Sequence, residues 1–202
     1  MTVHCANSGS MKSLLHVGAD VLLSVSDNPK RKLPYTWELI KIDGSWVGVN
    51  TLRTNHFVRE ALANRSIPEL SAYTEIKPEA RWADGTRFDF FLKNATDECF
   101  LEVKNVSLEE EKVALFPDSI TKRGTKHLQE LMAVVEKKKR AMMLFVVNRE
   151  DCRLFQPADS IDAVYGQTLR QAVAGGVEML VYSMQHLPPE SQLGHPVPFE
   201  LG

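Results

Sequence analysis

The segment Ala141–Val147 restricts the fold more than any other part of the sequence, because all seven of its residues are apolar. A short, unbroken apolar run is typical of a strand that is buried on both faces of a sheet. Helical periodicity flanks this segment at residues 121–138 and at Ile161–Ala174, and a second apolar strand follows at Val177–Tyr182. This alternation of helices and strands predicts an α/β architecture.

The predicted helices have an amphipathic spacing, which indicates the faces that they bury. A further helix is predicted at Thr54–Asn64, with Thr54 as its N-cap. In the helix at residues 121–138, the side chains expected to face the core are Leu128, Leu131, Met132 and Val135.

The first fifty residues have a different pattern, with short strands separated by turns. Strands are predicted at Ala19–Val25, Tyr35–Ile42 and Trp46–Val49. Several short strands with turn-rich links predict a small β-barrel or a part of one. We therefore predict two domains, a β-rich domain at residues 1–52 and an α/β domain at residues 53–202.

Two alternating segments of the second domain, residues 87–92 and 99–106, predict a hairpin that carries charged side chains. Alternation places Asp89 on one face of the first strand, and Glu102 and Lys104 on one face of the second. The apolar side chains expected on the opposite face of the first strand are Phe88, Phe90 and Leu92. When the two strands pair, an aspartate, a glutamate and a lysine lie side by side.

Two neighbouring carboxylates need a compensating cation, since like charges placed together out of water destabilise a fold. Two carboxylates with one backbone carbonyl suit Mg²⁺ or Mn²⁺, which keep several of their waters. We predict Asp89, Glu102 and the carbonyl group of Val103 as metal ligands. With Lys104, the two acids form the predicted catalytic centre, in which the lysine positions the attacking water or stabilises charge on a phosphate.

Alternating charges also occur on ordinary solvated strand faces, so motifs elsewhere in the chain decide between the two interpretations. These motifs are His4-Cys5-x-Asn7-x-Gly9-x-Met11, Arg31-Lys32, Trp37-Glu38-Leu39, Val49-Asn50-Thr51, Thr86-Arg87-x-Asp89-Phe90, Glu102-Val103-Lys104, Phe116-Pro117-Asp118 and Arg123-Gly124-x-Lys126-His127-Leu128-x-Glu130-Leu131. They extend over essentially the whole chain, and in them the sequence resembles the sugar fermentation stimulation protein family of bacteria and archaea.

This resemblance implies both a fold and a function. The family looks like an OB-fold-type N-terminal β-barrel joined to a PD-(D/E)XK nuclease-like α/β domain, and it is associated with DNA binding. The resemblance implies metal ligands at Asp89 and Glu102, with Lys104 as the accompanying lysine. Members usually have further residues before the segment that begins here at His4, so a shortened barrel without its first strands is expected. Thr86 stands where serine is common and keeps the hydroxyl group.

The helix at residues 121–138 carries the local positive charge that the whole-chain charge conceals. Residues 121–140 contain seven Lys or Arg against two Glu, in a chain of net charge -2. Helical spacing places Arg123 and His127 on one narrow face with Lys126 beside it, and we predict that these three contact nucleic-acid phosphates. For Lys137–Arg140 we prefer the interpretation that these cations are solvated and stabilise the C-terminal end of the helix through its dipole.

Other charged residues are weaker candidates. Glu60, on the first helix of the α/β domain, is a candidate accessory acid, although a surface glutamate is an equally good interpretation. Glu79 ranks below it. Arg31 and Lys32, in a basic turn of the first domain, are candidates for nucleic-acid contact or an ordinary solvated turn.

Composition points to a globular protein without a membrane segment. The chain is 44% hydrophobic and 25% charged, and its longest apolar runs are too short to span a bilayer. The N-terminal residues do not form a signal peptide, and the three cysteines have no zinc-ligand spacing. We therefore expect a cytoplasmic protein with reduced thiols.

These observations predict a DNA-binding protein with little sequence specificity, a nuclease-like site for Mg²⁺ or Mn²⁺, and, from the resemblance, a link to the regulation of sugar metabolism. The first alternative is an active metal-dependent endonuclease, motivated by Asp89, Glu102 and Lys104. The second is a sensor of small ligands such as sugars, which would use the barrel and the segment His4–Met11.

Overall fold

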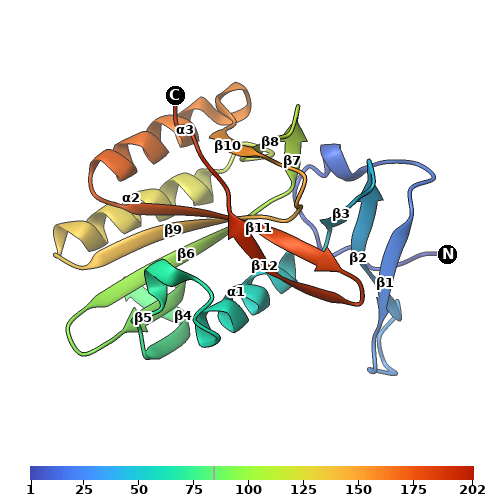
Figure 1. Ribbon diagram of the computed structural model, residues 1–202, viewed down its shortest axis with the longest axis horizontal. Coiled ribbons are helices and arrows are strands. Elements are labelled where there is room, and N and C mark those ends of the chain that lie inside the picture. Colours follow the sequence, from blue (N-terminus) through green and yellow to red (C-terminus); the bar gives the residue numbers. More distant parts are fainter. Residues whose placement is uncertain (84) are drawn as a thin grey trace.

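A mixed six-stranded sheet forms the centre of the computed structural model, which describes residues 1–83 and 85–202 (Figure 1). Its strands, in spatial order, are β12 (Glu190–Pro196), β11 (Glu178–Leu187), β9 (Arg140–Val147), β6 (Glu98–Val106), β5 (Thr86–Lys93) and β4 (Glu75–Ala83). Strands β11, β9 and β6 are parallel to one another, β12 pairs antiparallel with β11, β5 pairs antiparallel with β6, and β4 pairs antiparallel with β5. The predicted α/β architecture is confirmed.

Strand β9 lies between β6 and β11 and is buried along almost its whole length. Both of its faces therefore meet apolar side chains, which explains why its sequence does not alternate. Met142, Leu144 and Val146 pack toward Phe57 and Val58 of helix α1 (Thr54–Ala63). The side chains of the other parity pack in a second apolar cluster, with helices α2 (Lys122–Glu136) and α3 (Asp159–Ala174).

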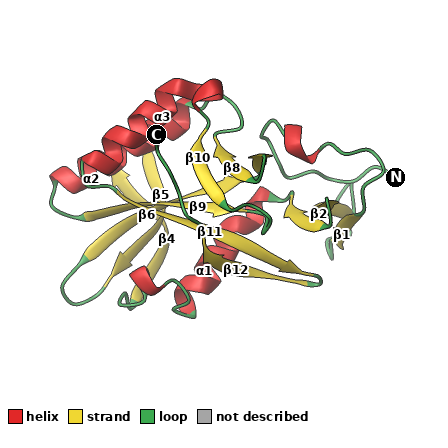
Figure 2. Ribbon diagram, turned by 45° about the horizontal axis from the view of Figure 1, so that its top comes forward, coloured by secondary structure: helices red, strands yellow, loops and turns green. Residues whose placement is uncertain are grey.

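The helices thus cover opposite faces of the sheet, with α2 and α3 side by side on one face and α1 on the other (Figure 2). All three helices lie where the sequence predicts them, with two differences in detail. Thr54 is the first residue of α1 and not its cap, because its backbone is already helical; its hydroxyl donates to Asn105 Oδ1 at 2.9 Å. In α2, Val134 is buried, whereas the predicted core residues Met132 and Val135 are only partly buried.

The N-terminal residues form a separate antiparallel sheet in the order β1 (Val21–Val25), β2 (Tyr35–Ile42) and β3 (Ser45–Gly48). These are the three strands that the sequence predicts. In the described part of the chain they make an open sheet and not a closed barrel. Strand β3 joins the second domain directly, since Gly48 N donates to Asn148 O at 2.7 Å. A Cβ atom at Gly48 would lie 2.1 Å from Asn148 Oδ1, so any larger residue here would displace the Asn148 side chain from its hydrogen bonds with Asn105 and His186.

Several short or polar strands are not apparent from the sequence pattern. Strands β7 (Leu108–Glu110), β8 (Val113–Phe116) and β10 (Leu154–Pro157) form a small third sheet in the order β10-β8-β7. Strand β4 contains Pro78, which a sheet accepts on an edge strand, where its missing N–H group faces outward. Strand β12 is also an edge strand, and its sequence is largely polar.

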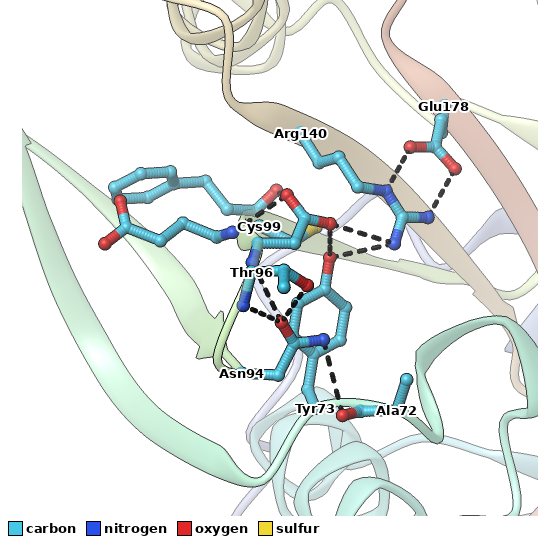
Figure 3. Close-up of polar contacts among 10 residues, drawn as sticks. Ala72, Tyr73, Asn94, Thr96, Cys99, Arg140 and Glu178 are labelled. Atoms are coloured by element: carbon cyan, nitrogen blue, oxygen red, sulfur yellow. Dashed lines mark hydrogen bonds and ion pairs between the residues drawn. The ribbon is translucent and has the colours of Figure 1, made fainter.

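A polar cluster ties together the starts of three sheet strands (Figure 3). Tyr73 Oη donates to Asp97 Oδ2 at 2.6 Å and accepts from Arg140 Nη1 at 2.8 Å. Arg140, at the start of β9, also binds both carboxylate oxygens of Glu178 at the start of β11. Burial raises the pKa of Tyr73 above its ordinary value, and the hydrogen bond to Asp97 adds to the rise. Arg140 therefore links the starts of the interior strands β6, β9 and β11 and does not extend the basic face of α2.

None of the described helices is long and apolar enough to cross a membrane.

Candidate active site

A cavity of about 590 Å³ opens between the β4–β5 hairpin, strand β6 and helix α2. Its lining includes Asp89 and Glu102, the two acids of the predicted centre. It also includes the predicted phosphate contacts Arg123, Lys126 and His127. The tertiary structure thus brings together residues from β5, β6 and α2 that are far apart in the sequence.

Asp89 lies where β5 separates from β6. The two strands pair from Phe90 opposite Leu101 outward to the hairpin turn, but not beyond Phe90 toward Asp89. The Asp89 carboxylate takes the place of the missing backbone partner, because its Oδ2 accepts from Val103 N at 2.8 Å. Its Oδ1 accepts from Asn55 Nδ2 of α1 at 2.7 Å. Both oxygens are therefore held in a defined position.

This separation also corrects one prediction about strand β5. Phe90 and Leu92 pack with helix α1, as one face of the strand should. Phe88 packs with α2 instead, against Phe100, with ring centroids 5.7 Å apart. Side chains of the same parity face different sides before and after Asp89, because β5 is no longer hydrogen-bonded to β6 beyond Phe90.

Glu102 lies deep in the cavity, with only 3% of its surface exposed. Its Oε1 is bonded to Lys104 Nζ at 2.5 Å and to His127 Nδ1. Its Oε2 is buried and has no hydrogen-bond partner among the described residues. A buried, unpartnered carboxylate oxygen destabilises a protein by about 1–3 kcal/mol or more, so its presence indicates a missing partner.

His127 has a different position from the one the sequence predicts. Its helical spacing predicts a phosphate-contacting surface, but it is only 7% exposed and touches Glu102 directly. Arg123 Nε, which can only donate, lies 3.4 Å from His127 Nε2. That contact favours Nε2 as the acceptor and Nδ1 as the protonated nitrogen that faces Glu102, and Lys104 Nζ lies 3.3 Å from the same Nδ1. His127 therefore orients the glutamate and is in turn oriented by Arg123.

The two acids have opposite pKa shifts. For Glu102, burial alone would raise the pKa, but the hydrogen bond from His127 and the charge of Lys104 lower it below the ordinary value. For Asp89, burial and the neighbouring charge of Glu102 raise the pKa, despite the hydrogen bonds from Val103 and Asn55. Glu102 is thus held ionised, and its negative charge opposes ionisation of Asp89.

Four cations surround the opening of the cavity: Arg81, Arg87, Arg123 and Lys126. Arg81 and Arg87 stand opposite each other in the β4–β5 ladder. None of the four forms an ion pair with a carboxylate among the described residues. Neither Arg81 nor Arg87 is among the residues predicted from the sequence, although Arg87 has the same strand parity as Asp89 and could have been found from that signal.

The structure places only one of the weaker candidates in the lining of this cavity. Glu60 is exposed, pairs with His56 Nε2 at 3.3 Å and lines a different pocket, next to β12. Glu79 lines the cavity itself, at the position of β4 between the residues that pair with Phe88 and Phe90, and therefore opposite Asp89. By position, Glu79 is therefore the better placed of the two candidate accessory acids, the reverse of the predicted order. Arg31 and Lys32 lie in the loop between β1 and β2, outside the lining of this cavity.

The acids suit a divalent cation that keeps most of its waters. No group of three or more His, Cys, Asp or Glu side chains in the described residues is arranged to hold a metal. Two carboxylates, one of them with a buried free oxygen, are nevertheless the kind of donor set that Mg²⁺ takes. Asp89 and Glu102 would be the ligands, and the carbonyl group of Val103 remains a predicted third ligand.

A second cavity, of about 480 Å³, lies between the N-terminal sheet, the start of α1 and the β11–β12 hairpin. Its walls are mainly apolar, with the carboxylate of Glu38 held by Ser24 Oγ at 2.6 Å and by Asn50 Nδ2 at 2.9 Å. His186 lines it too, and its ring is bonded to Asn148 Oδ1 and Ser191 Oγ, both at 2.9 Å. The segment His4–Met11, predicted to help bind small ligands, does not contribute to it.

Stability is expected to fall as the pH drops below about 6.5, because burial lowers the pKa of His186 below that ordinary value. At such a pH, His186 is protonated in the unfolded chain but stays neutral in the folded protein. The free energy of unfolding therefore decreases as the pH falls toward the lowered pKa. Urea unfolding at about pH 7.5 and about pH 5.5 measures this loss. His186→Gln should show a smaller loss over that interval, and an equal loss in both proteins would contradict the prediction.

Comparison with known proteins identifies the family. The model of the sugar fermentation stimulation protein RE domain matches residues 52–190, and the model of the SfsA N-terminal OB domain matches residues 1–49. The chain belongs to the sugar fermentation stimulation protein family. Relatives include a homolog from Geotalea uraniireducens that is 52% identical over 190 residues, covering 94% of this chain and 82% of the relative. A homolog from Geobacter sulfurreducens is 49% identical, covering 100% of this chain and 87% of the relative.

A solved structure of the family has the same fold. The structure of Pyrococcus furiosus SfsA in complex with Ca²⁺ matches with a TM-score of 0.89 over 98% of this chain and 85% of that one. The sequences are 23% identical, so the match shows the fold alone. The N-terminal sheet of this family member is therefore an OB domain, as the resemblance implies, followed by the α/β domain.

Proposed function

We propose that this chain binds DNA at the Asp89–Glu102 cavity, with little preference for base sequence, and that it holds Mg²⁺ or Mn²⁺ with these two carboxylates. The observation that carries the proposal is the buried Oε2 of Glu102, which has no partner among the described residues. A metal ion would supply that partner and relieve the repulsion that raises the pKa of Asp89. The Pyrococcus furiosus protein, whose structure is a complex with Ca²⁺, supports a divalent cation here.

The surrounding residues support phosphodiester DNA as the ligand. The lining of the cavity includes Arg81, Arg87, Arg123 and Lys126, and cations beside a metal site attract phosphates. Such contacts position a nucleic acid without reading its bases, which is why little sequence preference is proposed. The name of the relatives supports a role of this DNA binding in sugar metabolism.

A second proposed function is metal-dependent endonuclease activity, which the position of Lys104 favours. Its ammonium group is bonded to Glu102 Oε1 at 2.5 Å, and its side chain is 14% exposed, so it is held at the acid pair. A bound divalent cation lowers the pKa of water and neutralises charge on a phosphate. Lys104 would then orient the attacking water, while His127 keeps Glu102 in place. Incubation of supercoiled plasmid with the protein and Mn²⁺ tests this proposal, and the absence of nicking would refute it.

DNA binding should weaken steeply with salt, and each cation at the opening should contribute about one unit to the slope. Lys126→Gln and Arg87→Gln are each expected to reduce the slope of log affinity against log salt by about 0.9 on duplex DNA. Fluorescence anisotropy with a labelled duplex, with Ca²⁺ present and between about 50 and 200 mM salt, measures the slope.

Lys77→Gln is the matched control for these variants, because Lys77 already pairs with Glu75 at 2.5 Å and lies outside the cavity lining. Its slope should equal that of the unmodified protein. A slope near zero for the unmodified protein would contradict DNA binding at this surface.

A further inference from the structure

Thr86, the first residue of β5, has a buried hydroxyl group that no described residue binds. The residue is 3% exposed, and its Oγ1 has no hydrogen-bond partner among the described residues. Two other buried threonines do have partners: the Thr54 hydroxyl donates to Asn105 Oδ1 at 2.9 Å, and that of Thr168 donates to Val164 O at 2.7 Å. Valine has nearly the same shape and would fill the position of Thr86 without burying an unpaired hydroxyl.

The surroundings of Thr86 indicate what kind of ligand would bind its hydroxyl group. Thr86 lines the same cavity as Asp89 and Glu102. It has the strand parity of Phe88, whose side chain packs on the α2 side of the sheet, so Thr86 is directed toward the same side as Arg123 and Lys126. The unpartnered donor therefore lies in a space whose other donors are cations.

Two buried polar groups of this cavity, one a donor and one an acceptor, have no hydrogen-bond partner among the described residues. Thr86 Oγ1 offers a proton, and Glu102 Oε2 offers a lone pair. An anion alone would satisfy the hydroxyl but would be repelled by the glutamate, and a metal ion alone would leave the hydroxyl unpaired. A phosphate group accompanied by its divalent cation satisfies both, and it also matches the surrounding arginine and lysine side chains.

We propose that Thr86 is a phosphate-binding residue, whose hydroxyl donates a hydrogen bond to a non-bridging oxygen of a nucleotide phosphate held in the Asp89–Glu102 cavity. This inference rests on the proposed binding of DNA at the same site. It adds a residue that fixes the position of the phosphate, because the short, buried side chain of Thr86 has few rotamers, whereas the long lysine and arginine side chains of the lining are exposed and lose more conformational freedom on binding.

Isothermal titration with thymidine 3′,5′-bisphosphate in the presence of Ca²⁺ tests the proposal. The unmodified protein should bind this probe, and Thr86→Val should bind it about 10- to 100-fold more weakly, the loss typical of a hydrogen bond to a charged group. Thr86→Ser keeps the hydroxyl and should stay within about 3-fold of the unmodified protein. Anisotropy with a labelled DNA duplex and Ca²⁺ should rank the three proteins in the same order.

A structural role for the hydroxyl predicts a different result, which thermal unfolding without ligand reveals. If Thr86 serves a ligand, Thr86→Val should unfold at the same temperature or about 2–4 °C higher, because an unpaired buried hydroxyl is removed. Thr168→Val is the matched control, since it removes a hydroxyl that is already bonded. It should unfold at a lower temperature and bind the probe like the unmodified protein.

The outcomes separate this proposal from the proposed function. Equal binding of the probe by the unmodified protein and by Thr86→Val overturns the role of Thr86, whether or not DNA binds. Absence of probe binding in the unmodified protein overturns it as well. Probe binding that Thr86→Val weakens, in a protein that does not bind DNA, would keep the phosphate site and remove DNA as its ligand.

Discussion

Glutamine in place of Glu102 is expected to abolish the proposed Mn²⁺-dependent nicking of plasmid DNA, with a loss of more than about 100-fold. Changes to groups that merely support a metal ligand already cost about 10- to 100-fold at metal sites, and Glu102 is a proposed ligand itself. The substitution removes the charge whose free oxygen is buried in the cavity. It also removes the partner that holds Lys104 at 2.5 Å, so the lysine loses its position as well.

Glu98→Gln is the matched control, because Glu98 lies on the same strand β6 and is also paired with lysines. Its carboxylate binds Lys93 at 2.9 Å and Lys139 at 2.5 Å, outside the cavity lining. Nicking by Glu98→Gln should stay within about 2-fold of the unmodified protein, as expected for an exposed pair. Calorimetry should also show weaker binding of Mn²⁺ by Glu102→Gln than by the unmodified protein. Nicking that persists in Glu102→Gln would show that the activity does not come from this centre.

Methionine in place of Arg149 is expected to destabilise the protein by about 3–5 kcal/mol, the range for breaking a buried ion pair by removal of one partner. Arg149 follows β9 and is only 1% exposed. It binds both carboxylate oxygens of Asp151, at 2.6 and 2.8 Å, and lies 3.1 Å from Glu109 Oε2. Burial would raise the pKa of Asp151, but its hydrogen bonds from Arg149 and Lys112 lower it to about 2. Without Arg149, two largely buried carboxylates lose their shared cation.

Urea unfolding measures this loss, and a second variant separates charge from packing. Adding Asp151→Asn and Glu109→Gln to Arg149→Met should recover a large part of the stability, because the unpaired charges disappear. Lys77→Met is the surface control and should change stability by less than about 1 kcal/mol, since its side chain is 64% exposed. A loss below about 1 kcal/mol for Arg149→Met would contradict the assignment of a buried ion cluster.

Local pattern was sufficient for most of the secondary structure. The unbroken apolar run of β9 and the alternation in β5 and β6 identified these strands, because burial on two faces or one leaves a direct trace in the sequence. The edge strands β4 and β12 left no such trace. They pair on one side only, and their side chains are largely exposed, so nothing requires them to be apolar.

The same distinction applies to the site. The sequence by itself determined that Glu102 and Lys104 share one face of a strand, since parity decides the face, and that Asp89 lies on the preceding strand, since two alternating segments joined by a short polar loop form a hairpin. Only the tertiary structure decided that His127 is buried against Glu102, that Arg81 and Arg87 stand at the opening, and that Glu79 replaces Glu60 beside Asp89. These contacts depend on strand order, on the separation of β5 from β6 and on how α2 packs on the sheet. They join residues distant in the chain, and periodicity carries information only about neighbours within one element.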